Sequence, residues 1–288
     1  GGGLERGERH ARIGGKHSEW DAFSVKLATR RASTEITDPN VIKGLVGVMR
    51  GHDGEERWRR KQALVAVCNI LPDSRENREA AYECGLLDVC LNLLSETTNE
   101  DHKMRKLAVA CISNLSVEPR LKKAIGASHA LKYLIRFVRS NTGDARMLQY
   151  SLAALWSVCM GHKRNKAFVH IQTGVHELLL SLCRHPDALV RRQACGCVYE
   201  MCCDNMKAAQ EEFRYFGAEP TLSRLASGKL DGGGGGEQEE IEILEARRLA
   251  VATLQILCKN SAEWKAAGRT LGTPKSMGGS VLSVDEKV

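Results

Sequence analysis

Eleven cysteines are the residues with the most obvious capacity for chemistry, because thiolates bind zinc and thiols pair as disulfides. Cys195-x-Cys197 and the adjacent Cys202 and Cys203 come closest to a metal cluster. Neither has the second Cys pair or the His pair that structural zinc sites require. The count is odd, and most cysteines occur singly in apolar segments, which is not the pattern of a disulfide framework. We therefore interpret them as packing residues in a reducing compartment and predict no metal and no cofactor.

Pairs of basic residues are the second feature that could carry chemistry. They open four of five similar apolar segments, and a row of cations favours an acidic or phosphorylated partner. Charged residues also cover ordinary exposed helix faces, so the pattern alone leaves both interpretations open. The pairs are Arg60-Lys61, Arg105-Lys106, Arg191-Arg192 and Arg247-Arg248, and the remaining segment has Leu148-Gln149 instead.

Motifs of the common catalytic families are missing from the sequence. There is no Gly-x-x-x-x-Gly-Lys-Ser/Thr loop, no Gly-x-Ser-x-Gly elbow and no His-Glu-x-x-His pair. The five-glycine run at 232–236 has no strand before it and no lysine after it, so it is a weak candidate for a nucleotide loop. We predict that the chain is not an enzyme.

The apolar segments themselves form a repeat. Each has a small residue at position 0, a small residue at position 3, and apolar or β-branched residues at positions 4 and 7. The first residues lie 45, 43, 43 and 56 positions apart, and a period of forty-odd residues is typical of a helical solenoid. The copies are 63–70, 108–115, 151–158, 194–201 and 250–257.

Two further elements share this period. An apolar helix is expected after Gly85, His129, Gly174 and Gly217, which are 44, 45 and 43 positions apart, and an earlier copy begins at Asn40. A short helical segment precedes each of these four positions. Every period therefore predicts three helices.

This arrangement resembles the armadillo repeat, whose segments read Gly-apolar-apolar-x-x-Leu, Ala-x-x-Ala-Leu-x-Asn-Leu and Asn-Arg/Lys-x-x-Ile/Phe. Residues 63–70, Asn77-Arg78 and Gly85 match it, as do 108–115 and, in the third copy, Asn165-Lys166 with Gly174. The resemblance implies an all-α, right-handed superhelical solenoid of about five repeats with three helices each. The HEAT repeat is the nearest alternative.

We expect the following organisation. Residues 1–18 form a disordered basic tail, 19–38 a capping helix or partial repeat, and 269–288 a flexible tail. The armadillo repeats occupy 39–268, at about 39–84, 85–128, 129–173, 174–216 and 217–268. A flexible Gly/Glu loop at 228–240 accounts for the longest interval.

The same resemblance places the partner-binding groove on the third helix of each repeat, at positions −2 and 6. In armadillo proteins an Asn at position 6 bonds the backbone of an extended peptide. The expected groove residues are Lys61, Asn69, Lys106, Asn114, Gln149, Ser157, Arg192, Glu200 and Arg248, flanked by Arg60, Arg105, Arg191 and Arg247.

Position 2 argues against one branch of the family. Nuclear-import receptors carry Trp there, whereas this chain has Val65, Ala110, Ala153, Gly196 and Ala252. Trp156 is at position 5 instead, where a packing role is favoured over a ligand-stacking one. A separate hypothesis is that the glutamate-rich stretch 237–245 competes with an acidic ligand by folding over the basic residues.

We predict a non-enzymatic scaffold or adaptor that binds an extended or helical, acidic protein segment along the groove. The alternatives are the armadillo region of a larger protein, such as a ubiquitin ligase or a ciliary or cytoskeletal assembly factor, and a basic solenoid that binds RNA or an anionic membrane. Nucleic acid is disfavoured, because the net charge of +7 is modest and stacking aromatics are missing. No transmembrane segment is expected. The expected location is cytoplasmic, or else nuclear or cytoskeleton-associated.

Overall fold

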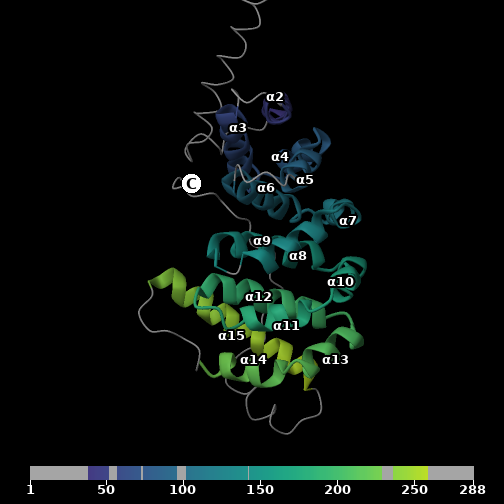
Figure 1. Cartoon of the computed structure of the whole chain (residues 1–288), viewed down its shortest axis with the longest axis vertical. Coiled ribbons are helices and arrows are strands. Elements are labelled where there is room, and N and C mark those ends of the chain that lie inside the picture. Colours follow the sequence, from purple (N-terminus) through teal and green to yellow (C-terminus); the bar gives the residue numbers. More distant parts are fainter. Residues whose placement is uncertain are drawn as a thin grey trace, which may run out of the picture. The chain divides into compact units, whose positions relative to one another are not determined.

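The computed structural model describes residues 38–51, 57–72, 74–95, 102–141, 143–228 and 236–258, and within these ranges all regular secondary structure is α-helical (Figure 1). The chain divides into two compact units, the first ending at Glu118 and the second beginning at Pro119. The expected basic tail, nearly all of the expected capping helix and the flexible C-terminal tail lie outside the described residues.

In the first unit, the five described helices pack through their apolar faces. Helix α2 packs on α3 and α4, α5 packs on α6, and α3 packs on α6. Side-chain oxygens of Asp38 and Ser74 accept hydrogen bonds from the free N–H groups at the starts of α2 and α4, as N-capping residues do. The helices are α2 (Pro39–Met49), α3 (Arg57–Ile70), α4 (Arg75–Glu83), α5 (Leu86–Ser95) and α6 (His102–Leu115).

The second unit contains nine described helices. Its long helices pack in series, since α12 contacts both α9 and α15 (Figure 1). The helices are α7 (Pro119–Ala127), α8 (Ala130–Ser140), α9 (Ala145–Cys159), α10 (Lys163–His170), α11 (Val175–Leu182), α12 (Ala188–Cys202), α13 (Lys207–Tyr215), α14 (Ala218–Ala226) and α15 (Glu237–Leu257).

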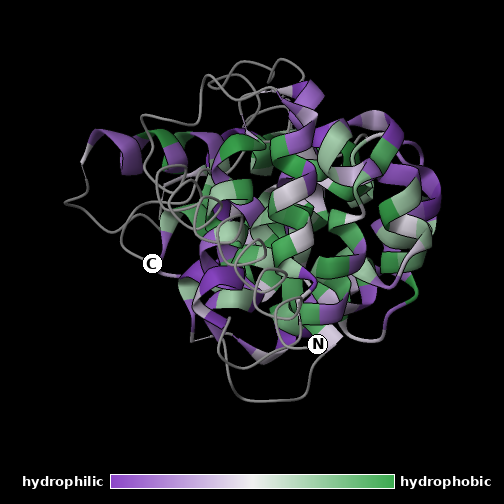
Figure 2. Ribbon diagram, turned by 90° about the horizontal axis from the view of Figure 1, so that it is seen from above, coloured by the Kyte–Doolittle hydropathy of each residue, from purple (hydrophilic) through white to green (hydrophobic). Residues whose placement is uncertain are grey.

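The repeated pattern is the core of the protein. The small residue at position 0 is fully buried in every copy, and the position-7 residue is at most 4% exposed. Small residues at position 0 let neighbouring helices approach closely, while the larger residue at position 7 fills the space beside them. Green and purple segments alternate along most helices in Figure 2, as expected when each helix buries one side.

Turns between helices follow the signals in the sequence. Gly174 and Gly217 precede α11 and α14 with φ of 70° and 77°, a left-handed conformation that glycine adopts without steric cost. His129 occupies the equivalent place before α8 with φ of −77°, so no glycine is required there. Asp187 caps the start of α12, because its Oδ1 accepts a hydrogen bond from the Val190 N–H at 2.9 Å.

One expected loop is partly helical. Residues 237–240 were assigned to a flexible loop, but α15 begins at Glu237 and runs for 21 residues. Glu237, Glu239 and Glu240 lie in its first turn, where negative charge stabilises a helix by interacting with the free N–H groups. The glutamate-rich stretch therefore adds extra turns to the third helix of the last repeat.

Candidate functional site

The third helices of the repeats carry the predicted groove residues. In the second unit these helices are α9, α12 and α15, and in the first unit they are α3 and α6, which contact each other. A surface formed by consecutive third helices thus exists in each unit. The second unit gives the fuller picture, because three consecutive third helices are described there.

Trp156 on α9 fills the space next to Gly196 on α12. Its side chain is 3% exposed, and a Cβ atom added to Gly196 would come within 2.4 Å of the indole ring. The guanidinium carbon of Arg192 lies 6.0 Å from the centroid of the same ring. The indole Nε1 has no hydrogen-bond partner within the described residues. Trp156 therefore packs as expected, and it also brings an unused N–H donor close to Arg192.

Each position −2 residue of the second unit has an acidic neighbour. The Gln149 amide donates to both carboxylate oxygens of Asp187 at 3.1 Å. Arg192 Nη1 donates to Glu242 Oε2 at 2.8 Å, and Arg248 Nη1 donates to Glu245 Oε1 at 2.9 Å. The two arginines of the predicted row thus already hold carboxylates that belong to this chain.

The Arg192–Glu242 pair is mostly enclosed, with side-chain exposures of 14% and 9%. Gln238 Nε2 donates a second hydrogen bond to the Glu242 carboxylate at 2.8 Å, so both of its oxygens are used. Enclosed pairs are little screened by solvent and depend strongly on having both partners. The hypothesis that the glutamate-rich stretch competes with an acidic ligand requires a contact of this kind. The stretch makes the contact as part of helix α15 and not as a loop.

The position-6 residues are more buried than expected for residues that line a binding groove. Asn69, Asn114, Ser157 and Glu200 are each at most 8% exposed. Asn114 Nδ2 donates to the backbone oxygen of Cys68 on the neighbouring third helix at 3.4 Å. Glu200 Oε1 accepts the Gly161 N–H at 3.0 Å. Their role in binding a partner backbone stays a prediction, and in this structure Asn114 and Glu200 join elements of their own unit.

Two of the four flanking position −3 arginines, Arg191 and Arg60, interact with backbone oxygens. Arg191 is 3% exposed and donates from Nη1 to the oxygens of His185 and Pro186 at 2.9 and 2.7 Å. Arg60 Nε donates to the oxygen of Met49, the last residue of α2, at 3.2 Å. A cation near the end of a helix stabilises its free carbonyl groups. In each of these two basic pairs, the position −3 arginine therefore has a structural role. Arg105 and Arg247 are half-buried, as are Lys61 and Lys106.

Lys166 is a fully buried cation that joins α10 to the end of α12. Its Nζ lies 2.5 Å from Glu200 Oε1 and 2.7 Å from Asp204 Oδ2. Burial alone would lower the pKa of Lys166, but the hydrogen bonds and the attraction of both carboxylates outweigh it and raise the pKa. The hydrogen bond from Lys166 lowers the pKa of Asp204. These charges are partnered, so we assign them to stability and not to catalysis.

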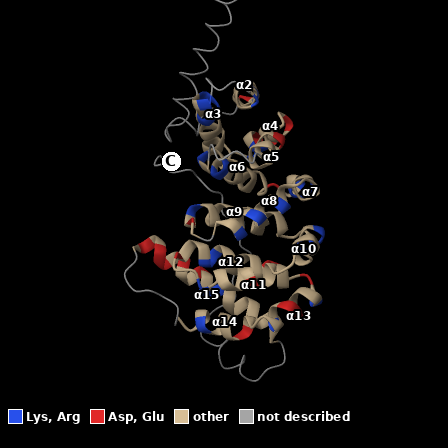
Figure 3. Ribbon diagram, in the orientation of Figure 1, with Lys and Arg blue, Asp and Glu red and all other residues tan. Residues whose placement is uncertain are grey.

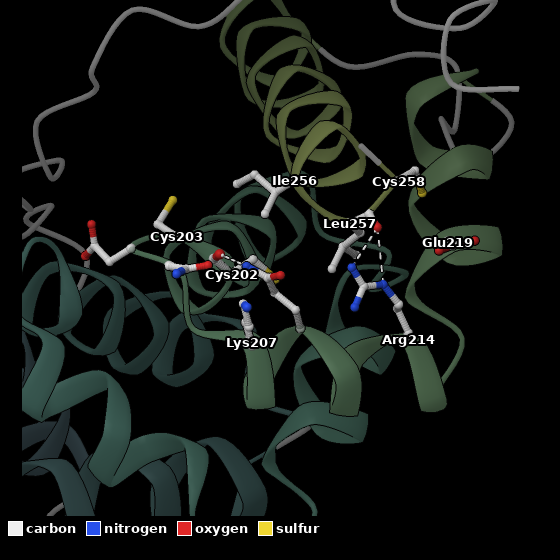
Figure 4. A pocket seen from close by; sticks show the side chains of 11 residues that line it. Cys202, Cys203, Lys207, Arg214, Glu219, Ile256, Leu257 and Cys258 are labelled. Atoms are coloured by element: carbon white, nitrogen blue, oxygen red, sulfur yellow. Dashed lines mark hydrogen bonds between the residues drawn. The ribbon is translucent and has the colours of Figure 1, made fainter. Parts of the chain in front are cut away.

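A cavity of about 880 Å³ lies at the end of α15, lined by residues of α12, α13, α14 and α15 (Figure 4). Its polar groups satisfy helix ends: both Arg214 Nε and Nη2 donate to the Leu257 oxygen, and Gln210 Nε2 donates to the Cys202 oxygen. Burial raises the pKa of the Cys202 thiol, which disfavours the reactive thiolate. The cavity therefore shows no catalytic arrangement.

The other cysteines resemble Cys202. All eleven cysteines are free thiols, and eight of them are buried. No group of three or more His, Cys, Asp or Glu residues suited to a metal ion occurs in the described part of the chain. Among the helices of that part, none combines the length and apolar character needed to cross a bilayer.

Comparisons with known proteins show which repeat family and which fold this chain resembles. Residues 74–117 match the Armadillo/beta-catenin-like repeat family. The designed armadillo repeat protein YIII(Dq)4CqI is 20% identical over 82% of this chain and 92% of its own, with a TM-score of 0.66. One stretch of this chain thus matches the armadillo repeat, and the chain shares the all-α solenoid fold of armadillo-repeat proteins. Members of this fold class are typically non-enzymatic binding scaffolds.

Two other solved structures share this fold. The designed protein YIII(Dq.V1)4CPAF, solved in complex with the peptide (KR)4, is 17% identical over 82% of this chain and 90% of its own, with a TM-score of 0.61. Chaetomium thermophilum Raptor is 17% identical over 88% of this chain but 22% of its own, with a TM-score of 0.63. A search of curated proteins found no match.

The sequence missed the acidic partners of the groove. Glu242 and Asp187 lie 50 and 38 residues from the side chains that they bind, so no local motif marks them. The Glu245–Arg248 pair has the i, i+3 spacing of helix ion pairs and was recognisable in principle. Trp156 was recognised as a packing residue, but its position over Gly196 required the structure.

Proposed function

We propose that this protein is a non-enzymatic scaffold whose third-helix surface binds an acidic segment of a partner protein. The supporting observation is that Arg192 and Arg248 already bind the carboxylates of Glu242 and Glu245. A site that holds two carboxylates of its own chain has the donors that a partner's Asp or Glu side chains need. The partner would replace the internal glutamates.

The groups around Arg192 extend this proposal to the backbone of the partner. The Trp156 indole N–H has no acceptor within the described residues and lies next to the arginine. This donor is buried, so a carbonyl of an extended or helical segment could accept from it only after the Arg192–Glu242 contact opens. The related designed protein that was solved with (KR)4 holds a basic peptide, whereas the arginines here favour the opposite charge.

Glu242 gives the surface an internal competitor. An acidic partner has to break the Arg192–Glu242 contact, so its observed affinity is reduced by the fraction of molecules in which that contact is closed. We place this binding activity in the cytoplasm, because eight of the eleven cysteines are buried as free thiols, which suits a reducing compartment.

Binding of matched peptides to the whole chain tests this proposal. Fluorescence anisotropy with a Glu-rich peptide, a Lys-rich peptide and a Gln-rich peptide of equal length should show binding of the Glu-rich peptide only. The double variant Arg192→Glu/Arg248→Glu should lose that binding, while the exposed α14 variant Arg224→Glu should keep it. Equal binding of the Glu-rich peptide by the double variant would show that these arginines are not the site.

A further inference from the structure

Positive charge is concentrated in one part of the second unit. Residues 119–176 contain ten Lys and Arg side chains but one acidic residue, Asp144, which gives this stretch a net charge of +9. The whole chain carries +7, so the remainder is slightly acidic. Helices α7, α8 and α10 show blue and no red in Figure 3. Such an imbalance creates a local positive potential that the net charge of the chain conceals.

Seven of these cations are exposed on three helices that contact one another, and we call this set of residues the basic face. On α8 three of them follow the i, i+4, i+7 spacing of a single helix side. The basic face consists of Arg120 and Lys123 on α7, Lys132, Arg136 and Arg139 on α8, and Lys163 and Arg164 on α10.

Few of these cations are neutralised by the protein. Lys123, Lys132 and Arg164 form no ion pair within the described residues. Arg139 donates to the backbone oxygen of Thr173, and Arg136 lies with its guanidinium carbon 4.9 Å from the centroid of the Tyr133 ring. A contact with a carbonyl leaves the positive charge of Arg139 in place. Exposed cations such as Lys123, Lys132 and Arg164 repel one another, and an anionic ligand relieves this repulsion.

We infer that the basic face binds the phosphate backbone of a nucleic acid. Successive cations along α8 are about 4.5–6 Å apart along the helix axis, given a rise of about 1.5 Å per residue. Lysine and arginine at such intervals neutralise several phosphates of one strand and release its counterions, and this supplies most of the affinity of sequence-independent binding. Arginine adds a planar fork that suits phosphate oxygens.

The chemistry of the basic face favours a nucleic acid over a protein or a membrane. Protein interfaces take most of their energy from buried aromatic or apolar anchors, and membrane-surface helices insert apolar side chains into the lipid. The described stretch of 119–176 exposes one large apolar side chain, Ile171, which lies just beyond the end of α10. Phosphate contacts require cations and no apolar anchor. The inference does not depend on the proposed acid-binding surface of the third helices.

The test uses a fluorescein-labelled 20-nucleotide oligouridine as the probe and the whole chain as the protein. A triple variant removes one exposed cation from each helix: Lys123→Gln, Lys132→Gln and Arg164→Gln. The matched control, Arg184→Gln/Lys207→Gln/Arg224→Gln, removes three exposed cations from elsewhere in the same unit. Both variants have the same net charge, so any difference between them reports position and not total charge.

We expect the wild type and the control to bind oligouridine with similar affinity and the basic-face variant to bind at least tenfold more weakly in low salt. The slope of log K against log salt concentration should flatten by about 2, since each lost phosphate contact in single strands contributes about 0.7. Equal loss in both triple variants would overturn the inference. So would a wild type that binds a poly-glutamate peptide or phosphatidylserine vesicles through these residues but not oligouridine.

Discussion

Arg192 Nη1 on α12 donates a hydrogen bond to Glu242 Oε2 on α15 across 2.8 Å, and both side chains are largely enclosed. The arginine belongs to the third helix of one repeat and the glutamate to the extended third helix of the next. The pair therefore ties two neighbouring repeats together at the surface where an armadillo protein is expected to bind its partner. Under the proposed function, stability and binding are therefore coupled through this contact.

Replacing Gly196 with alanine should destabilise the second unit, because the added Cβ would overlap the buried ring of Trp156 at 2.4 Å. Overpacking of this kind typically costs about 1–3 kcal/mol in free energy of unfolding. Urea unfolding followed by circular dichroism measures the change. Gly47→Ala on α2 is the matched control, since its Cβ would meet nothing within 4 Å, and it should be neutral or slightly stabilising. Equal stability of Gly196→Ala and wild type would contradict the packing.

Removal of the buried cation Lys166 should be more damaging. Lys166→Met leaves Glu200, which is 7% exposed, without its counter-charge, and breaking a buried ion pair costs about 3–5 kcal/mol. Asp204→Asn serves as the control, because this carboxylate is 40% exposed and asparagine tolerates its left-handed φ of 56°. The control should lose less than about 1 kcal/mol, as exposed pairs do. A loss in Lys166→Met no greater than in the control would show that the buried pair adds little.

Stability of the second unit should fall in mild acid because of His176. Burial, with a smaller contribution from the nearby His170 ring, lowers the pKa of His176 to about 4. The neutral ring packs edge-on against Phe213 and lies 3.0 Å from His170 between ring nitrogens. The unfolded chain binds a proton near pH 6.5 while the folded chain does not, so stability is full above that pH and declines as pH falls toward about 4.

Thermal unfolding measured from pH 7.5 to 4.5 tests the role of His176. The His176→Gln variant should be less stable at pH 7.5, but its melting temperature should fall less steeply with acidification than that of the wild type. Parallel pH profiles for the two proteins would assign the acid sensitivity to other groups.

The repeat architecture was predictable because its signal is redundant. Position 0 is small in five copies and fully buried in all of them, so one ambiguous segment could not mislead the assignment. The extent of α15 was not predictable, because five glycines before Glu237 indicate a loop without showing where it ends. Glu242 of this helix also reaches Arg192, a contact between different repeats that no local pattern reveals.

The functional surfaces were only partly visible in the sequence. Basic pairs were recognised, but Arg191 and Arg192 are adjacent in sequence and have different roles: one binds backbone oxygens and the other a carboxylate. A local pattern cannot separate such roles, because the partners come from elsewhere in the fold. The basic face escaped notice for a different reason. The net charge of +7 does not show where the positive charge lies along the chain, and residues 119–176 account for all of it.

The most direct test of the acid-binding surface is a double-mutant cycle on Arg192 and Glu242, read as the Kd of a Glu-rich peptide. Glu242→Gln should bind the peptide about 5- to 10-fold more tightly, because the internal competitor is gone, which corresponds to roughly 1–1.4 kcal/mol of coupling. Arg192→Gln and the double variant should both bind more weakly than wild type and to the same extent. If Glu242→Gln leaves the Kd unchanged, or tightens binding equally when Arg192 is absent, the internal carboxylate does not occupy the partner's site.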